Sequence, residues 1–363
     1  MSEKNYGLIG CGMMGTEHLL NVSRLDGARF AVVYDPLPDN AARAAQIAGG
    51  ARVAGSVADL LAHPELDAVV ICSPNFCHLD QLEEIARIRP LPVLCEKPLY
   101  TRPEDAARIA TFAASYKPPV WVAMEYRYMP PIEALIDEVE SATGGVKMLT
   151  LREHRIPFLK KYGDWNRFNE NTGGTLVEKC CHFFDLMRLI IGSEPVRVMA
   201  SAGQMVNHFD EVYDGKTPDI WDGGYVIFDF ASGARAMLEL CMFADGTKWN
   251  EEISCVGPAG KIECRIPGPQ RFWPAHLGEP PVPELSLYPR HPKNPSTRLL
   301  PIDPALSRIG DHHGSTFTQH ARFLDVVCGR GGVAVSLEDG AKAVRMGLAA
   351  QEAARRNSVI DLG

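Results

Sequence analysis

Several features are missing from this 363-residue sequence, and each absence excludes a class of protein. No apolar run is long enough to span a bilayer. The polar start, Met1 to Tyr6, leads directly into an apolar segment and leaves no room for a signal peptide. The net charge of −8 offers no broad basic surface for phosphate contacts. We therefore expect a cytoplasmic protein with no nucleic-acid and no membrane partner.

The sequence also contains no Cys-x-x-Cys pair, no internal repeat and no low-complexity tract. Its ten cysteines are expected to be ordinary thiols, and the adjacent Cys180 and Cys181 are a poor pair for a mutual disulfide. Hydrophobic residues make up 46% and charged residues 23% of the chain, as in globular proteins. Because 363 residues are too many for one ordinary core, we predict two domains.

The first 125 residues alternate short apolar runs with helical patterns, which is typical of a parallel sheet built from βαβ units. The predicted strands are residues 6–9, 30–34, 68–72, 92–95 and 120–123. The predicted helices are residues 15–25, 40–48, 80–87 and 103–115. This pattern predicts a doubly wound α/β domain of the Rossmann type over residues 1–125.

After Tyr126 the pattern changes to that of an α+β domain with an open, mostly antiparallel sheet, predicted over residues 126–363. A helix near residues 131–141 and a strand over 146–154 precede one long amphipathic helix over 174–191. An antiparallel meander is predicted over residues 196–202, 224–230, 234–243, 251–256 and 261–266. The proline-dense residues 267–304 are predicted to be a long loop. A closing helix over 337–356 could pack back on the first domain.

A glycine motif follows the first predicted strand and opens the first predicted helix; its residues are Gly10, Cys11, Gly12, Met13, Met14 and Gly15. The glycines permit a tight turn, close approach of a pyrophosphate and close packing of helix on strand. Asp35 ends the second strand, where a ribose diol would be held and a 2′-phosphate repelled. The motif predicts NAD rather than NADP; the alternative is a glycine turn with an incidental aspartate.

Four further motifs make a family resemblance specific: Ile71-Cys72-Ser73-Pro74-Asn75 with His78, Glu96-Lys97-Pro98, Glu125 to Pro130, and Gly173 to Asp185. Together with the glycine motif, they resemble the glucose–fructose oxidoreductase/inositol dehydrogenase (Gfo/Idh/MocA) family along the whole chain. The resemblance implies that Ser73, Pro74, Asn75, His78, Glu96 and Lys97 bind the cofactor. It also implies a substrate cleft between two domains and a homodimer or homotetramer formed through the second-domain sheet.

Hydride transfer from a carbinol leaves a carbonyl, so a proton must depart from the oxygen and the protein must accept it. Lys97 follows a strand at the carboxyl edge of the sheet, where open α/β sheets bind ligands. Apolar or cationic surroundings can lower a lysine pKa towards the working pH. We therefore interpret Lys97 as catalytic; the alternative is a surface lysine in a turn.

Glu178, His182 and Asp185 recur at i, i+4 and i+7 of the predicted 174–191 helix and should share one face. His182 can exchange a proton near neutral pH, and Glu178 can orient it or contact a substrate hydroxyl. Glu178 stands where the family usually has aspartate, which leaves open whether His182 or Lys97 is the principal base; we favour His182. The alternatives are a core histidine and a zinc site, and we expect no metal because Cys181 points to another face.

A basic stretch surrounds Trp165 and comprises Arg152, His154, Arg155, Lys160, Lys161 and Arg167. It is either a solvated strand edge and loop or a site for an anionic sugar substituent. Further predicted substrate contacts are Arg127, Tyr128, Glu178, Lys179, Asp185 and His313. Near His313, Ser315 or Thr316 could instead serve as a helix N-cap.

The residues and the resemblance together predict an NAD-dependent oxidoreductase acting on a CH–OH group of a sugar, a cyclitol or a sugar acid. A second hypothesis is a glycoside hydrolase that oxidises its substrate, eliminates the aglycone and returns the hydride from transiently reduced NAD. If the basic stretch binds an anion, a sulfonated sugar such as a sulfoquinovoside is a candidate substrate for it. A third hypothesis is a non-catalytic NAD-binding sensor.

Overall fold

The computed structural model describes residues 3–363, which divide into two compact units. The first unit runs to Glu125 and also includes Gly314–Val344, and the second comprises Tyr126–His313 with Arg345–Gly363. The sequence pattern had assigned everything after residue 125 to the second domain. No helix in the described part of the chain combines the length and the apolar character needed to cross a membrane.

The first unit contains a six-stranded parallel sheet with the order β3-β2-β1-β4-β5-β6. Its strands are β1 (Lys4–Ile9), β2 (Ala28–Tyr34), β3 (Arg52–Val53), β4 (Ala68–Ile71), β5 (Val93–Cys95) and β6 (Val120–Val122). The apolar runs of β4, β5 and β6 are buried along their whole length, as parallel strands covered on both faces require. The order confirms the doubly wound fold, and it places the switch point between β1 and β4.

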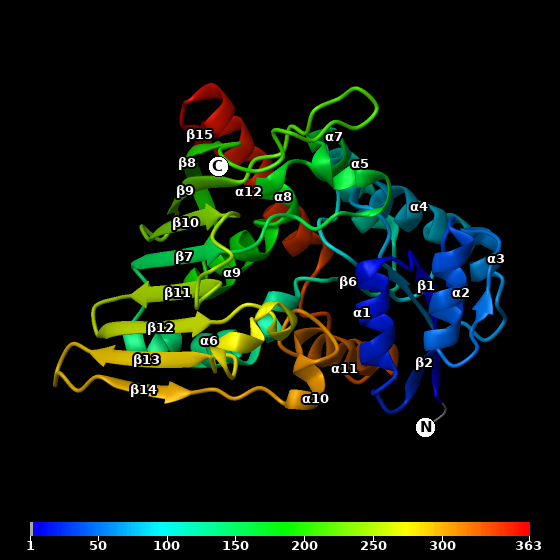
Figure 1. Ribbon diagram of the computed structural model, residues 1–363, viewed down its shortest axis with the longest axis horizontal. Coiled ribbons are helices and arrows are strands. Elements are labelled where there is room, and N and C mark those ends of the chain that lie inside the picture. Colours follow the sequence, from blue (N-terminus) through cyan, green and yellow to red (C-terminus); the bar gives the residue numbers. More distant parts are fainter. Residues whose placement is uncertain (1–2) are drawn as a thin grey trace. The chain divides into compact units, whose positions relative to one another are not determined.

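Helices flank this sheet in two groups, because α1 contacts α2 and α11 whereas α4 contacts α3 and α5. The helices are α1 (Met13–Val22), α2 (Pro38–Ile47), α3 (Val57–Leu61), α4 (His78–Ile88), α5 (Asp105–Ser115) and α11 (Ser315–Val327). Helix α11, far along the sequence, therefore lies beside the helix that follows the glycine motif (Figure 1).

The second unit contains a nine-stranded sheet with the order β14-β13-β12-β11-β7-β10-β9-β8-β15. Its strands are β7 (Met148–His154), β8 (Pro195–Gly203), β9 (Gly223–Phe230), β10 (Arg235–Cys241), β11 (Glu251–Val256), β12 (Gly260–Ile266), β13 (Glu284–Pro289), β14 (Ser296–Leu299) and β15 (Ile360–Asp361). All neighbours pair antiparallel except β7 and β10. The prediction of an open, mostly antiparallel sheet is confirmed.

Two details of the predicted second domain are wrong. The meander is interrupted, because β7 lies between β10 and β11 and pairs with both. Residues 267–304 are not one long loop, because β13 and β14 extend the sheet there. Three of the prolines of this segment, Pro289, Pro292 and Pro295, stand at the end of β13 and in the connection to β14, where they remove few ladder donors.

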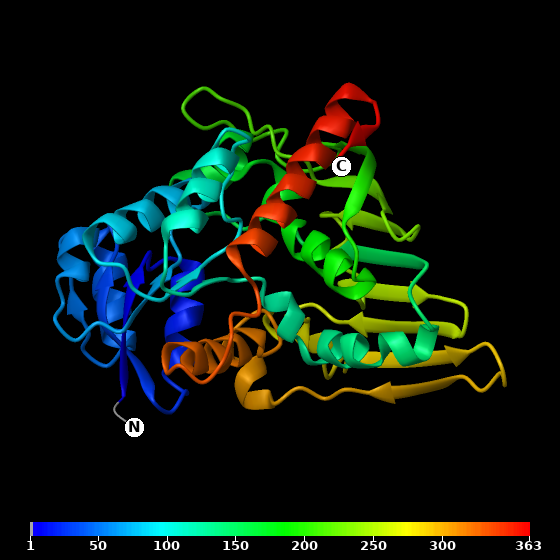
Figure 2. The same cartoon turned by 180° about the vertical axis from the view of Figure 1, so that it is seen from behind.

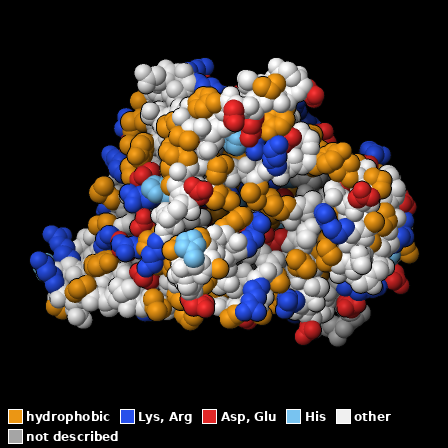
Figure 3. All heavy atoms as spheres, viewed as in Figure 1, with side chains coloured by type: hydrophobic (Ala, Val, Ile, Leu, Met, Phe, Trp, Pro, Cys, Tyr) orange, Lys and Arg blue, Asp and Glu red, His pale blue; other side chains and the backbone are white. Residues whose placement is uncertain are grey.

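Helices cover one face of this sheet and leave the other face open (Figure 2). They are α6 (Pro130–Thr143), α9 (Cys181–Ile191) and the C-terminal part of α12 (Leu337–Arg356). Side chains such as Leu135, Phe184 and Ala350 join alternate strand residues in one apolar core. On the open face, charged and apolar side chains are interspersed (Figure 3). Met148 and Tyr225 are exposed apolar side chains of its strands.

The predicted helix over residues 174–191 is also wrong, because it is broken into α8 (Thr175–Glu178) and α9. The carbonyl of Thr175 accepts from the amide of Lys179 at 3.0 Å and from that of Cys180 at 3.4 Å. The second bond spans five residues, so the turn is wider than an α-helical one. Glu178 therefore ends one helix, and the predicted i, i+4, i+7 spacing to His182 and Asp185 does not hold along one helix.

Candidate cofactor site and proton-transfer cluster

The three motif glycines in the first unit serve different purposes. A Cβ on Gly10, where φ is +89°, would lie 2.5 Å from the backbone nitrogen of Ser73. A Cβ on Gly15 would lie 2.2 Å from the carbonyl oxygen of Gly10. A Cβ on Gly12, by contrast, would meet no atom within 4 Å. Packing therefore explains the first and third glycines, and Gly12 leaves an open approach for a ligand.

That approach ends at the N-terminus of α1. Gly12 is the N-cap and makes no side-chain capping bond, and the first turn holds no acidic side chain. Met13 and Met14 thus begin a helix whose N–H groups and dipole suit a pyrophosphate. Asp35 fixes the same turn, because its carboxylate accepts from the Cys11 amide at 2.7 Å and from the Leu37 amide at 2.9 Å. Each oxygen keeps a second lone pair for a ribose hydroxyl.

A buried histidine joins the loop after β4 to the segment after β5. The two ring nitrogens of His78 lie 2.7 Å from the Pro98 carbonyl and 3.0 Å from the Ser73 carbonyl. Burial lowers the pKa of His78 even though both carbonyls favour its charged form. The short 3₁₀ turn Asn75–Cys77, preceded by Pro74, lies between Ser73 and His78. The structure therefore brings Ser73, Pro74, Asn75 and His78 beside the Glu96-Lys97-Pro98 segment.

Glu96 is held by a second chain of buried groups. Its Oε1 lies 2.9 Å from His18 Nε2, and His18 Nδ1 lies 2.7 Å from His320 Nε2 on α11. Burial would raise the pKa of Glu96, but the hydrogen bond and charge of His18 leave it lowered. Glu96 Oε2 accepts from the Lys97 amide at 3.2 Å. Lys97 is thereby fixed at the carboxyl end of β5, half-buried, as the motif predicts.

A cluster of proton-carrying side chains lies in the second unit, on the helix-covered side of the sheet. The rings of Tyr126 and His182 stack with centroids 4.2 Å apart and 9° between their planes. Lys179 Nζ donates to the hydroxyl of Tyr126 and lies 2.8 Å from Glu153 Oε1. All four are buried, as is Glu178, and burial lowers the pKa of Lys179. The widened turn at Lys179 directs its side chain to the sheet.

Sequence reasoning missed Tyr126 and Glu153 of this cluster, and also Glu251, which is buried opposite Glu153 on β11. Glu153 follows Leu149 and Leu151 on the buried face of β7, and Glu251 precedes Ile253 and Cys255 on that of β11. The sequence did contain a signal for these two residues, because each glutamate continues the alternation of the apolar residues that form the buried face of its strand.

Two residues predicted to contact substrate instead bind each other. Arg127 donates from Nε to Asp185 Oδ2 at 2.6 Å and from Nη2 to Asp185 Oδ1 at 2.5 Å. This bidentate pair is buried and ties the 3₁₀ turn Glu125–Tyr128 to α9. Tyr128, in the same turn, is buried as well. The pair fixes the segment that carries Tyr126 against the helix that carries His182.

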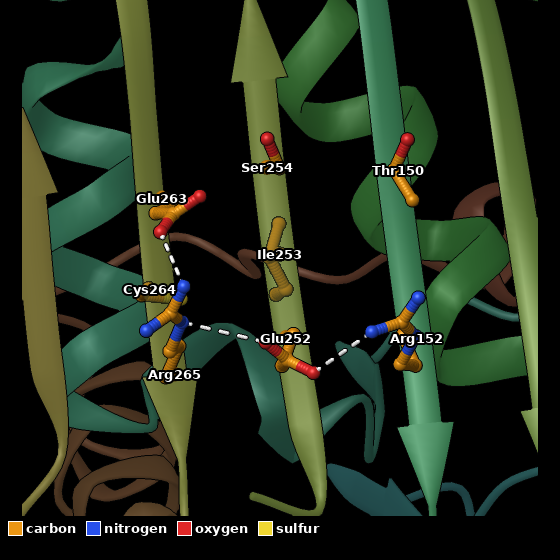
Figure 4. Close-up of a pocket in the computed structure, with 8 residues that line it drawn as sticks. All are labelled: Thr150, Arg152, Glu252, Ile253, Ser254, Glu263, Cys264 and Arg265. Carbon is orange, nitrogen blue, oxygen red and sulfur yellow. Dashed lines mark hydrogen bonds and ion pairs between the residues drawn. The ribbon is translucent and has the colours of Figure 1, made fainter. Parts of the chain in front are cut away.

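The structure does not bring the basic stretch together. Arg152 and His154 point to the open face of the sheet, where they bind Glu239 and Glu252 (Figure 4 shows Arg152 with Glu252). Only Arg155 approaches the cluster, with Nη1 3.7 Å from Glu153 Oε1. The remaining residues make local contacts: Arg167 with Glu211, Lys160 over Tyr213 and Lys161 over Trp165.

His313 also has a local partner, because its Nε2 lies 2.9 Å from the Pro267 carbonyl. Burial lowers the pKa of His313 to about 4, which keeps the ring neutral. The helix-cap alternative near it does not hold, because the N-cap of α11 is Gly314 without a side-chain cap, and Thr316 donates to Glu17. All ten cysteines are free thiols, and no group of three candidate ligands in residues 3–363 is arranged for a metal.

Comparison with known proteins agrees with this geometry. The family described as "Oxidoreductase family, NAD-binding Rossmann fold" matches residues 4–124, and its "C-terminal alpha/beta domain" matches residues 140–362. The chain belongs to the Gfo/Idh/MocA family. This member is therefore an oxidoreductase whose first unit is an NAD-binding Rossmann domain, as the sequence predicts.

Two curated relatives and two solved structures illustrate the likeness. The rhizopine catabolism protein MocA of Rhizobium meliloti is 26% identical over 76% of this chain and 80% of its own length. Inositol 2-dehydrogenase of R. meliloti strain 1021 is 30% identical over 64% of this chain and 67% of its own. The structure of a levoglucosan dehydrogenase in complex with NADH has a TM-score of 0.81 to this chain at 20% sequence identity. The structure of myo-inositol 2-dehydrogenase from Lactobacillus plantarum has a TM-score of 0.77 at 18% identity. Each comparison covers 100% of this chain and 100% of the other chain.

The open approach at Gly12 gives a test of the cofactor site. We expect Gly12→Val to fold normally, since a Cβ there meets no protein atom within 4 Å, but to raise the Kd for NAD at least about 100-fold by filling the path of the pyrophosphate. Isothermal titration calorimetry would measure this. Gly332→Val in the same unit, where a Cβ also meets nothing within 4 Å, should bind NAD normally. Equal NAD affinity in both variants would contradict the assignment.

Proposed function

We propose that this Gfo/Idh/MocA member is an NAD-dependent dehydrogenase that oxidises a CH–OH group of a sugar, a cyclitol or a sugar acid. The observation that carries the proposal is the buried stack of Tyr126 on His182 with Lys179 at the tyrosine hydroxyl. Such a cluster can take up the proton that leaves a carbinol oxygen. Relatives named for inositol dehydrogenation support the substrate class.

In this proposal the residues of the first unit bind the cofactor and the residues of the second unit manage the proton. The amides that follow Gly12 hold the pyrophosphate, and Asp35 holds the ribose diol. NAD, when bound, accepts the hydride. His182 accepts the hydroxyl proton on its imidazole, Glu178 accepts a hydrogen bond from a neighbouring substrate hydroxyl, and Lys97 is the alternative base.

The test is an assay of the purified protein with NAD and a panel of free cyclitols, sugars, sugar acids and aryl glycosides. NADH absorbance and aglycone release are followed together. Stoichiometric NADH formation from a free polyol supports the dehydrogenase. Tight NAD binding with neither signal across the panel would contradict it and indicate a sensor.

The second candidate is a glycoside hydrolase that uses NAD transiently, on an anionic glycoside such as a sulfoquinovoside or on a neutral one. One observation favours it: Lys179, Glu153 and Glu251 are further buried proton carriers in the second unit, and Lys179 links Glu153 to Tyr126. A cycle of oxidation, elimination and re-reduction needs an additional base for C–H removal and must return the protons it takes. Aglycone release with catalytic NAD and no net NADH would identify this activity.

We also propose that copies of the chain assemble as a homodimer or homotetramer through the open face of the nine-stranded sheet. Met148 is 61% exposed and Tyr225 54%, and both lie on this face among charged side chains. The face also has a shallow pocket of about 220 Å³ across β7, β11 and β12 (Figure 4). Exposed apolar side chains in such a surface are typical of interfaces. The ten free thiols suit the reducing cytoplasm, which we propose as its location.

We expect Met148→Glu to lower the oligomeric state, because it replaces an exposed apolar side chain of this face by a charged one. Sedimentation velocity would show a lighter species than for the native protein. Tyr162→Glu, a change at a still more exposed side chain outside the sheet, is the control and should sediment as the native protein does. If Met148→Glu sediments as the native protein does, the proposed interface is wrong.

A further inference from the structure

Two acidic side chains face each other in the core of the second unit. The antiparallel register of β7 and β11 pairs Glu153 with Glu251, and both are buried. The next pairs on the same face are Leu151 with Ile253 and Leu149 with Cys255. Like charges directly opposite each other on a sheet destabilise it, and buried carboxylates are costly without partners. Packing and stability alone therefore do not explain a pair of glutamates at this position.

Two cationic side chains lie beside Glu153. Lys179 Nζ lies 2.8 Å from Glu153 Oε1, and Arg155 Nη1 lies 3.7 Å from the same oxygen. Glu153 Oε2 is buried without a hydrogen-bond partner among the described residues. A carboxylate oxygen in that state is an acceptor site for a proton.

Burial first, and then the charge of Glu153, raise the pKa of Glu251 to about 7. Lys179, Arg155 and His312 act in the opposite direction. The titratable or charged groups that face the pair come from each packed element and are Tyr126, Glu153, Arg155, Lys179, Cys180, Cys264 and His312. The pair can thus be doubly ionised or hold one proton near neutral pH.

A hydrogen-bonded path leads from this pair to the ring stacked on His182. Lys179 Nζ contacts both Glu153 Oε1 and the hydroxyl of Tyr126. Because Lys179 donates to the tyrosine oxygen, the hydroxyl hydrogen of Tyr126 is directed elsewhere and can be exchanged with another oxygen. The tyrosine ring in turn lies flat on His182.

We propose that Glu153 and Glu251 form a proton-holding pair that serves the substrate oxygen through Lys179 and Tyr126. This inference rests on the proposed function. During oxidation, Lys179 first gives a proton to the carboxyl pair, the Tyr126 hydroxyl proton then moves to the lysine nitrogen so freed, and the Tyr126 oxygen takes up the proton that leaves the substrate through His182. At each step one bond to hydrogen breaks and one forms, either O–H or N–H, and no electrons are transferred. During reduction the same protons move back, so Lys179, Glu153 and Glu251 are positioning residues that act through Tyr126.

The test compares Glu251→Gln with Glu252→Gln, the next residue of β11, which faces the open side of the sheet. Infrared spectroscopy of the NAD-loaded protein follows the carboxylic-acid band through a pH titration without any substrate. We expect the native protein and Glu252→Gln to lose one band around pH 7, and Glu251→Gln to lack it. A native protein without this band, or an identical titration of Glu251→Gln, would overturn the proposal.

Kinetics give the second readout. We expect Glu251→Gln to lower kcat for oxidation at least about tenfold and to shift the rising limb of its pH profile, with the Kd for NAD unchanged. Tyr126→Phe keeps the ring on His182 and should lower kcat similarly. A substrate panel without turnover, with the infrared band as expected, would refute the proposed function but support the carboxyl pair. Normal kcat and an unshifted profile in Glu251→Gln would overturn the pair's role while the dehydrogenase remains established.

Discussion

Replacing His182 by asparagine is expected to lower kcat by about 10³ while the Kd for NAD stays within about twofold of the native value. A positioned general base contributes typically about 10²–10⁴ in rate, and asparagine can fill the site and donate a hydrogen bond but cannot accept a proton at neutral pH. The dinucleotide residues lie in the first unit and His182 in the second, so binding and proton transfer are separable. Single-turnover NADH formation and calorimetric NAD titration would measure the two effects.

Lys97→Met is the companion change, and it distinguishes the two candidate bases. Methionine keeps the length of the side chain and removes only the ammonium group. If His182 is the principal base, Lys97→Met should lower kcat less than His182→Asn does and should leave the pH profile of the residual activity in place. The matched control is Lys117→Met, a change at a lysine of the first unit that follows α5. A native rate of NADH formation in His182→Asn would contradict the assignment of His182 as the principal base.

The cofactor site could be predicted from the sequence because each of its parts is local. Gly10, Gly12 and Gly15 lie within six residues, and the reasons for them, close backbone approach and an open helix N-terminus, depend only on the turn they form. Lys97 follows directly from the end of a strand. The parallel order of the sheet then places these short segments along one edge, so recognising the fold was enough to gather them.

The proton-transfer cluster could be predicted only in part, because its contacts join residues far apart in sequence. The 174–191 pattern pointed to Glu178, Lys179 and His182, but apolar periodicity does not reveal a hydrogen bond shifted from four residues to five. Nor does it name partners: Asp185 faces Arg127 rather than an open site. The alternation of β7 places the carboxylate of Glu153 on the buried face and the cation of Arg152 on the open face. Interpreting the basic stretch as one patch ignored this alternation.

The pairing of Asp185 with Arg127 leads to the largest expected effect on stability. Asp185 is fully buried and Arg127 is 11% exposed, so Asp185→Ala leaves a guanidinium group in the core without its carboxylate. Removing one partner of a buried pair costs roughly 3–5 kcal/mol. We expect the unfolding transition of the second unit to move to lower urea concentration accordingly, as measured by fluorescence.

The matched control is Asp325→Ala, which removes the carboxylate of a pair with Arg330 whose side chains are 51% and 42% exposed. An exposed pair is screened by water, so its loss should cost at most about 1 kcal/mol. Because Asp325 lies in the first unit, the transition of the second unit should not move in this variant. Equal losses of unfolding free energy in the two variants would show that the Arg127–Asp185 pair does not hold Tyr126 against the helix that carries His182. In that case Asp185→Ala should also leave kcat unchanged, whereas a loosened Tyr126–His182 stack should lower it.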